Sequence, residues 1–359
     1  MPAHVVVVKN TSTAMASKGK IIVTGGTGFI GSHTAVELIQ SDYEVVLIDN
    51  LSNSTADVVK GISKIVGFEP PLEVIDLCDR VATHEVFKKH QDAVGLIHFA
   101  ALKAVGESVQ YPIKYYQNNL GSLCTVAEAM SENGIGNLIF SSSATVYGQP
   151  KELPATESSP IQPANSPYGF TKQMGEVIVK DWTYAKEGQS AIALRYFNPI
   201  GCHPSSNIGE VPTGVPSNLM PFITQTAAGL REELKVFGQD YETKDGTAIR
   251  DYIHVVDIAK AHVSALDRLV DNKMDEDYEV YNLGVGKGIS VLEVIQSFEK
   301  TSGEKLKYAF ADRREGDVEA VFASTQKAND VLGWKAMYDL DEMTKTAWVW
   351  EKKLRGLDK

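Results

Sequence analysis

The stretch KIIVTGGTGFIGSHTAVELIQ, residues 20–40, decides the fold of this chain. It opens with a short apolar run, rich in β-branched residues, that is typical of a buried strand. A glycine-rich turn follows, and the residues after it have helical character. Gly26, Gly28 and Gly31 satisfy the pattern G-x-G-x-x-G, while Gly25, Gly28 and Gly31 give the alternative three-residue spacing. Strand, glycine turn and helix in this order predict a βα unit whose backbone amides approach the pyrophosphate of a dinucleotide.

A second apolar run, residues 44–48, ends at Asp49, twenty-one residues after Gly28. A carboxylate at this position can accept hydrogen bonds from the adenosine ribose hydroxyls, and it repels a 2′-phosphate. The next basic residue is Lys60, so no nearby cation is available to bind that phosphate. The sequence therefore favours NAD over NADP as the cofactor.

Further strand candidates alternate with segments of helical length. The candidate strands are residues 72–75, 94–99, 138–143, 191–196 and 279–283, and the clearest helices are residues 122–132 and 169–186. This alternation predicts an α/β fold with a parallel, doubly wound (Rossmann) sheet. From Asn198 onward, loops rich in Gly, Pro and Asn favour a smaller C-terminal α/β substrate lobe.

The expected domains are therefore residues 20–198 for the dinucleotide and residues 199–359 for the substrate, and a later strand can return to the main sheet. Residues 1–19 are expected to be a disordered extension, with an alternative start at Met15 or a weak transit peptide as the other interpretations.

Composition excludes several classes of protein. The 359 residues are 43% hydrophobic, which suits a globular core, and the net charge of −11 argues against a general nucleic-acid or anionic-membrane surface. Cys78, Cys124 and Cys202 have no C-x-x-C spacing, so neither a disulfide framework nor a metal site is expected. No apolar run approaches the roughly 20 residues that span a bilayer. A soluble protein of the reducing cytosol is the expectation.

The segment SPYGFTK, residues 166–172, carries the candidate chemistry. Tyr168 and Lys172 are four residues apart, so a helix would place them on one face, where the ammonium favours the phenolate. Ser143 ends a predicted strand and can bond a substrate oxygen. The three residues are candidate catalytic groups. The alternative is an ordinary surface pair on an amphipathic helix.

Several ordered blocks of the chain resemble the extended short-chain dehydrogenase/reductase family, in particular its sugar-nucleotide epimerases. The resemblance runs from about Lys20 to Trp350, and its most specific blocks are VTGGTGFIGSHT at Val23, LIDNLSNS at Leu47, HFAALKAVGESV at His98, FSSSATVYG at Phe140, SPYGFTK at Ser166, LRYFNPIGCHPS at Leu194, SNLMPF at Ser217, GTAIRDYIHVVD at Gly246 and RREGD at Arg313.

The resemblance implies site residues block by block, and it implies a homodimer. Beyond the glycine turn, it implies NAD contacts from Phe29, Ile30, Asp49, Asn50, Leu51, Ser52, Asn53, Ser54, Asp76, Leu77, Phe99, Ala100, Ala101, Leu102, Lys103, Asn118, Tyr168, Lys172 and Phe197. It implies UDP-sugar contacts, beside Ser143, from Asn198, Asn218, Leu219, Phe237, Arg250, Arg314 and Asp317. For Arg250 the alternative is a structural ion pair with Asp251, and His254 is expected to be structural.

The activity that the resemblance implies is reversible epimerisation at C4 of UDP-glucose and UDP-galactose through a 4-keto sugar, with tightly bound NAD. A UDP-xylose/UDP-arabinose epimerase shares this chemistry. A sugar dehydratase is disfavoured, because Ala144 and Thr145 stand after Ser143 where that branch carries Asp-Glu. A non-catalytic nucleotide-sensing protein is the alternative from another class.

Val321 bears on the breadth of substrates. The resemblance places it beside the sugar pocket, at a position where members of the family carry either tyrosine or a smaller residue. Valine leaves room for an N-acetyl group on sugar C2, so UDP-GlcNAc and UDP-GalNAc are candidate substrates. The alternative is ordinary core packing.

Overall fold

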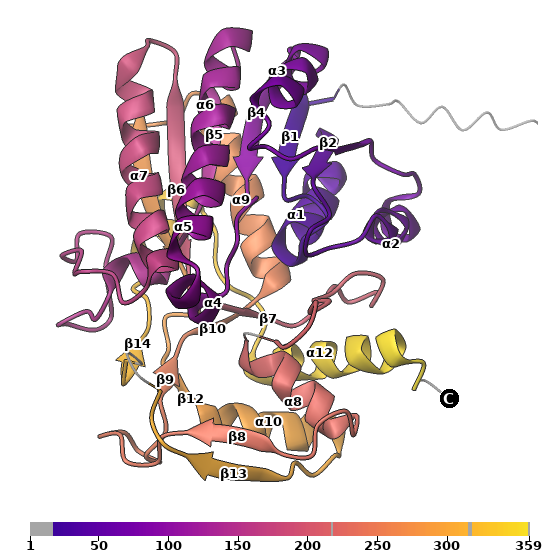
Figure 1. Ribbon diagram of the computed structural model, residues 1–359, viewed down its shortest axis with the longest axis vertical. Coiled ribbons are helices and arrows are strands. Elements are labelled where there is room, and N and C mark those ends of the chain that lie inside the picture. Colours follow the sequence, from indigo (N-terminus) through magenta and orange to yellow (C-terminus); the bar gives the residue numbers. More distant parts are fainter. Residues whose placement is uncertain (1–16, 217, 315–317, 358–359) are drawn as a thin grey trace, which may run out of the picture.

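The structure is a computed structural model that describes residues 17–216, 218–314 and 318–357 (Figure 1). Residues 1–16, the greater part of the predicted extension, lie outside the described residues. The chain forms a large upper part built on a sheet and a smaller part below it (Figure 1).

Within the described residues, seven parallel strands form the main sheet in the order β3-β2-β1-β4-β5-β6-β11. This confirms the predicted doubly wound sheet. β1 pairs with β2 on one side and β4 on the other, and such a reversal of strand order opens a crevice at the carboxyl ends of the strands. The strands are β1 (Lys20–Thr24), β2 (Glu44–Asp49), β3 (Leu72–Val74), β4 (Ala93–His98), β5 (Asn137–Ser143), β6 (Ser190–Tyr196) and β11 (Tyr278–Leu283).

Helices cover both faces of the sheet because its strands are apolar on both faces. Along β1, Ile21 and Val23 join one core cluster and Ile22 joins the other, as the two-residue period of a strand requires. The first cluster packs under α1 (Phe29–Gln40), α2 (Asp57–Val66) and α9 (Val255–Val270), and the second under α3 (Arg80–Lys89), α6 (Gly121–Asn133) and α7 (Pro167–Ala185).

Short helices connect the sheet to these layers at its carboxyl edge. They are α4 (Val105–Gln110), α5 (Pro112–Tyr115), the π-helix η1 (Tyr116–Leu120) and the 3-10 helix η2 (Ala144–Tyr147). π-helical turns are rare, and those that occur are frequently found at functional sites.

The lower part has its own apolar core, in which Ile223, Val236, Phe298 and Trp348 are buried. α9 and β11, although they come after Asn198 in the chain, pack with the main sheet, and α11 (Gln326–Leu332) packs on both. The remaining elements are β7 (Asn198–Ile200), α8 (Leu219–Ala227), β8 (Leu234–Phe237), β9 (Ile249–Arg250), β10 (Tyr252–His254), β12 (Ile289–Ser290), α10 (Val291–Ser302), β13 (Tyr308–Ala311), β14 (Ala320–Val321) and α12 (Leu340–Arg355).

Two findings agree with the composition. None of the helices in the described part of the chain is both long and apolar enough to cross a membrane. Cys78, Cys124 and Cys202 are all free thiols, and the first two are exposed.

Candidate active site

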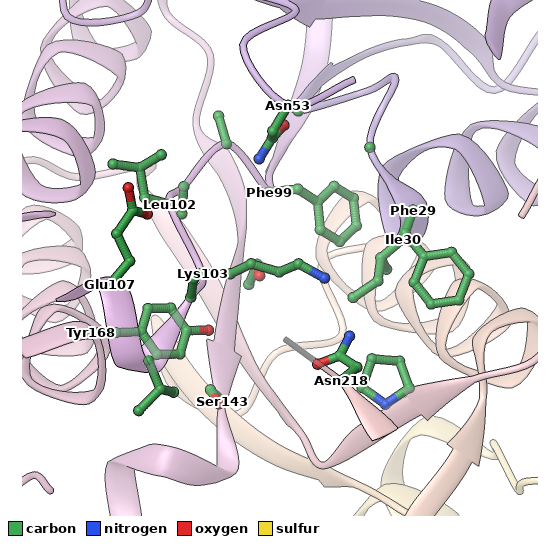
Figure 2. Close-up of a pocket in the computed structure, with 18 of the residues that line it drawn as sticks. Phe29, Ile30, Asn53, Phe99, Leu102, Lys103, Glu107, Ser143, Tyr168 and Asn218 are labelled. Atoms are coloured by element: carbon green, nitrogen blue, oxygen red, sulfur yellow. The ribbon is translucent and has the colours of Figure 1, made fainter. Parts of the chain in front are cut away.

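A cavity of about 1010 Å³ lies at the carboxyl edge of the main sheet, between the sheet and the lower part. The glycine turn after β1 and the loops after β2 and β4 line it on one side, and Arg250, Arg314 and Val321 line it on the other. Tyr168 and Ser143 also line it, and Figure 2 shows the Tyr168 side chain drawn between those of Lys103 and Ser143. The cavity therefore joins segments that are separated by almost 300 residues of sequence.

The glycine turn leaves backbone close to the cavity. A Cβ atom on Gly31 would lie 2.2 Å from the carbonyl oxygen of Gly25, so the first turn of α1 can pack on the loop only with glycine at this position. Gly28 precedes α1, and the amides of the first helical turn have no carbonyl partner within the helix. Such amides suit a pyrophosphate.

Asp49 ends β2, and its side chain is held in place by three hydrogen bonds. Its Oδ2 atom accepts from the Thr27 amide at 3.1 Å, and its Oδ1 atom accepts from the Leu51 amide at 2.9 Å and the Ser54 hydroxyl at 3.1 Å. The residue is 7% exposed and lines the cavity. The fixed carboxylate and the glycine turn beside it fit a dinucleotide with an unmodified ribose.

Helix α7, which carries Tyr168 and Lys172, begins close to the end of β5. Ser166 caps the helix by accepting from the Gly169 amide at 3.1 Å, and Pro167 occupies its first turn. Lys172 donates from Nζ to the Ser141 carbonyl at 2.5 Å, and its Nζ atom lies 5.9 Å from the centroid of the Tyr168 ring. The structure thus places the helical pair beside the strand end that carries Ser143.

Burial controls the protonation of this pair. Burial raises the pKa of Tyr168 to about 12, against a side-chain hydrogen bond from Ser143 that lowers it. Burial also lowers the pKa of Lys172 to about 8, against the nearby charge of Glu176, which raises it. From the sequence, Lys172 is expected to lower the pKa of Tyr168. In the structure burial is the largest influence on that pKa, and it raises it.

A buried ion pair fixes α7 to the sheet. Glu176, one turn after Lys172, accepts from Arg195 of β6 at 2.8 and 2.6 Å and from the Ser142 hydroxyl at 2.5 Å. Arg195 also donates to the Tyr147 hydroxyl at 3.0 Å. Sequence reasoning missed this network, and its only signal was an acidic residue and an arginine at otherwise apolar positions.

The loop after β4 is tied to the same helix. Asn119 accepts from the Leu102 amide at 2.8 Å and donates to the Leu102 carbonyl at 3.0 Å and to the Thr171 hydroxyl at 3.1 Å. Asn119 lies in η1 directly after Asn118, which lines the cavity.

The structure gathers most of the predicted site residues around this cavity. Of the predicted cofactor and catalytic residues, those that line it are Gly25, Gly28, Phe29, Ile30, Gly31, Asp49, Asn50, Ser52, Asn53, Ser54, Asp76, Leu77, Phe99, Ala100, Ala101, Leu102, Lys103, Asn118, Ser143, Tyr168, Lys172 and Phe197. Of the predicted substrate residues, Asn198, Asn218, Arg250, Arg314 and Val321 line it.

Four predicted residues are not among the described residues that line the cavity. Leu51 contributes its amide to the fixation of Asp49 instead. Leu219 packs against the lower core at the start of α8, and the Phe237 ring lies under the Arg314 guanidinium at 4.0 Å. Asp317 lies outside the described residues.

Sequence reasoning also missed part of the cavity wall. The missed lining residues are Thr27, Thr55, Val58, Ile75, Ala104, Val105, Glu107, Lys114, Tyr115, Ser122, Ser141, Ala144, Thr145, Gly148, Asn165, Ser166, Gly169, Tyr196, Pro199, Gly209, Glu210, Val211, Pro212, Thr213, Val215, Pro216 and Val318. The run from residue 209 to residue 216 lacks the periodicity of a helix or a strand, so its position depends on tertiary contacts.

The fold and this cavity define a class of protein. Residues 21–284 match the NAD dependent epimerase/dehydratase family, and the chain belongs to that family. Within the family, the chain is 50% identical over 331 residues to the UDP-glucose 4-epimerase of Bacillus subtilis, covering 92% of this chain and 96% of the relative.

Two solved structures show how closely the fold is shared. The UDP-glucose-4-epimerase of Stenotrophomonas maltophila, crystallised with bound NAD and formylated UDP-arabinopyranose, is 44% identical, with a TM-score of 0.91 over 94% of this chain and 99% of its own. The UDP-glucose 4-epimerase of Bifidobacterium longum, in complex with NAD+ and UDP, is also 44% identical, with a TM-score of 0.88 over 93% of this chain and 98% of its own.

Proposed function

We propose that this chain catalyses the reversible epimerisation of UDP-glucose and UDP-galactose at C4 through a 4-keto sugar, with NAD as a bound cofactor. The observation that carries the proposal is the position of Ser143, Tyr168 and Lys172, which line one cavity between a fixed acidic dinucleotide site and two arginines. The Bacillus subtilis relative is a UDP-glucose 4-epimerase, and the two solved structures contain NAD together with UDP or a UDP-sugar.

The dinucleotide fits the side of the cavity that the glycine turn forms. Gly28 and Gly31 would admit the pyrophosphate to the backbone amides of α1, and Asp49 would accept from the ribose hydroxyls. Lys103, Asn118 and the loop after β4 would complete this side. When bound, NAD supplies a reversible acceptor for the hydride of sugar C4.

Tyr168 is the residue that we assign to proton transfer. Its phenolate oxygen would take the proton of the sugar 4-hydroxyl, and its phenol would give a proton back to the carbonyl oxygen of the keto sugar. Ser143 holds the same oxygen by a hydrogen bond. Lys172, with Nζ fixed on the Ser141 carbonyl, keeps a positive charge beside Tyr168 below a pH of about 8 and opposes the burial that disfavours the phenolate.

The substrate side holds the nucleotide through a few groups and leaves the sugar room to turn. Arg250 and Arg314 would bind the diphosphate through paired N–H donors, and Asn198 and Asn218 would meet polar edges of the nucleotide and sugar. If the keto sugar rotates while the diphosphate stays bound, the hydride returns to its opposite face and the configuration at C4 inverts.

We extend the proposal to acetylated sugars. Val321 lines the cavity and is 8% exposed, in a small apolar cluster with Tyr147 and Phe197. A valine at this position leaves space that a tyrosine ring would fill, so UDP-GlcNAc and UDP-GalNAc are proposed as further substrates.

We also propose a homodimer, in which the outer face of α4, α5 and α7 meets a second copy. Val109, Tyr111 and Ile113 are 57–62% exposed, and Phe170 and Val177 on α7 are 44% and 51% exposed. Such clustered apolar exposure is unusual on a monomer. Light scattering of the native chain and of Val109→Glu tests it, and a native monomer would refute it.

The free thiols support a reducing compartment such as the cytosol.

The decisive experiment is an assay of the purified chain with UDP-glucose and UDP-galactose, followed by identification of the cofactor released on denaturation. Interconversion without added cofactor, with NAD(H) released, is expected. Turnover of UDP-xylose and UDP-arabinose alone would favour the pentose epimerase, loss of water from the sugar would favour a dehydratase, and nucleotide binding without turnover would favour a sensing role. Release of mainly NADP(H) would refute the role of Asp49.

A further inference from the structure

Glu210 stands in the cavity wall at a point where the two halves of the site meet. It lies among residues 201–216, which follow β7, and its side chain is 15% exposed. Neither sequence reasoning nor the proposed mechanism gives this carboxylate a role. An acidic side chain in a cavity expected to hold two diphosphates needs a physical explanation, because alone it would repel both.

The carboxylate binds one group from each side of the cavity through a single oxygen. Oε1 of Glu210 accepts from Lys103 Nζ at 3.1 Å and from Asn218 Nδ2 at 2.8 Å. Lys103 belongs to the loop on the cofactor side, and Asn218 precedes α8 on the substrate side. Figure 2 shows the Lys103 side chain extending across the cavity toward the side of Asn218.

The segment that carries Glu210 is anchored from behind. The Glu210 carbonyl accepts from Trp350 Nε1 of α12 at 2.7 Å, and a Cβ atom on Gly209 would lie 2.5 Å from the Trp350 ring. Lys353 donates to Asn207 at 2.8 Å, and Ile208 is buried in the core beside α2. The carboxylate therefore projects from a supported wall, and it can hold other side chains in position.

We propose that Glu210 is a positioning residue that couples the two binding sites, by holding Lys103 and Asn218 in the places where NAD and the UDP-sugar need them. Lys103 neutralises the carboxylate and keeps two further N–H donors, and Asn218 keeps a second N–H and its carbonyl oxygen. Both residues can thus remain on Glu210 while they contact ligand. This inference rests on the proposed function for the identity of the ligands.

Such coupling is reciprocal, so loss of the bridge should weaken both sites together. Glu210→Gln keeps the shape and a carbonyl acceptor for Asn218 but removes the charge that binds Lys103. We expect this variant to release NAD about fivefold faster and to bind UDP about fivefold more weakly, with a smaller change in kcat than in KM.

A matched control is available in α10. Glu299 is 19% exposed and pairs with Lys305 at 2.8 Å, much as Glu210 pairs with Lys103, but it is not among the residues that line the cavity. Glu299→Gln should leave NAD release and UDP binding at native values. Equal effects of the two substitutions would overturn the proposal, because the loss of any lysine pair would then be sufficient.

Lys103→Gln provides the second arm of the test. Lys103 lies on the cofactor side, so the proposal requires its loss to weaken UDP binding through Glu210 and to add little in the Glu210→Gln background. The proposal would be overturned if the two substitutions weakened UDP binding additively. It would also be overturned by native behaviour of Glu210→Gln or by tighter UDP binding of that variant. The last result would show that Glu210 acts on the ligands only by repulsion.

Two quantities are measured. NAD release is monitored as the amount of cofactor that stays with the protein during dialysis, and UDP affinity is measured by calorimetry. Neither needs turnover, so failure of the native chain to interconvert UDP-hexoses would refute the proposed function alone. Failure of the native chain to bind UDP would overturn both proposals.

Discussion

The two walls of the cavity are built in different ways. The wall that we propose for the cofactor comes from residues 25–118, in which each lining segment follows one strand or helix of a regular βα succession. The wall that we propose for the substrate comes from residues 198–321, where short strands such as β9 and β14 meet only through tertiary pairing. Local geometry therefore determines the first wall, and long-range packing determines the second. Substitutions in the cofactor wall should reduce the amount of bound cofactor. Substitutions in the substrate wall should reduce the affinity or the selectivity for substrate.

The largest effect is expected where the walls meet. Tyr168→Phe removes the proton-accepting oxygen and keeps the ring, so kcat should fall roughly 1,000-fold. The melting temperature and the NAD content should stay close to native, because the burial of the ring is unchanged. Near-native turnover would refute the assignment of Tyr168.

On the cofactor wall, Gly31→Ala should remove most of the bound NAD and reduce stability by about 1–3 kcal/mol. The new Cβ atom would lie 2.2 Å from the Gly25 carbonyl, so the turn must shift. Gly106→Ala is the matched control, since a Cβ atom there has no neighbour within 4 Å. NAD content is measured after denaturation, and equal losses in the two variants would contradict the role of the turn.

On the substrate wall, Val321→Tyr should reduce activity on UDP-GlcNAc and UDP-GalNAc roughly tenfold or more, with much less effect on UDP-glucose and UDP-galactose. The tyrosine ring would occupy the space that the acetyl group needs. Kinetics with both pairs of sugars check it. A native chain without activity on the acetylated pair, or an equal loss on both pairs, would refute the steric argument.

A smaller effect is expected for Arg314→Lys. The Arg314 guanidinium lies 4.0 Å from the Phe237 ring centroid, a cation–π contact that an ammonium reproduces poorly. The KM for UDP-hexose should rise about five- to tenfold, while NAD content stays native. A loss of NAD with unchanged KM would show that Arg314 supports the cofactor and not the substrate.

The cofactor side should also lose stability as the pH falls. Burial lowers the pKa of His33, in α1, to about 3 from its ordinary value of 6.5. The unfolded chain therefore binds more protons between these values, and the stability that neutral His33 permits is complete above pH 6.5 and is lost as the pH falls toward 3. Between pH 7 and pH 5 the loss is roughly 2 kcal/mol.

His33→Asn tests this linkage, because asparagine can replace the bond from Nδ1 to the Phe29 carbonyl without an ionisable ring. Melting temperatures measured from pH 7 to pH 5 should fall less steeply for the variant than for the native chain. Equal slopes would show that other groups govern the acid response.

Much of this protein was predictable from sequence because it depends on short-range geometry. Gly25 to Gly31, Asp49, and the spacing of Tyr168 and Lys172 are determined by the periods of a strand and a helix and by the length of a βα turn. Those rules predicted the parallel sheet and brought the glycine turn, Asp49, Tyr168 and Lys172 to one cavity, and the resemblance supplied the arginines and asparagines of its other side.

Only the tertiary structure decided the rest. In it, β11 and α9 pack with the main sheet, and the Phe237 ring contacts the Arg314 guanidinium. Glu210 accepts hydrogen bonds from both Lys103 and Asn218. The tertiary structure also showed that burial, rather than the charge of Lys172, is the largest influence on the pKa of Tyr168. Sequence spacing says which side chains of one element share a face, but contacts between distant segments, and the loss of water around them, exist only once the chain has packed.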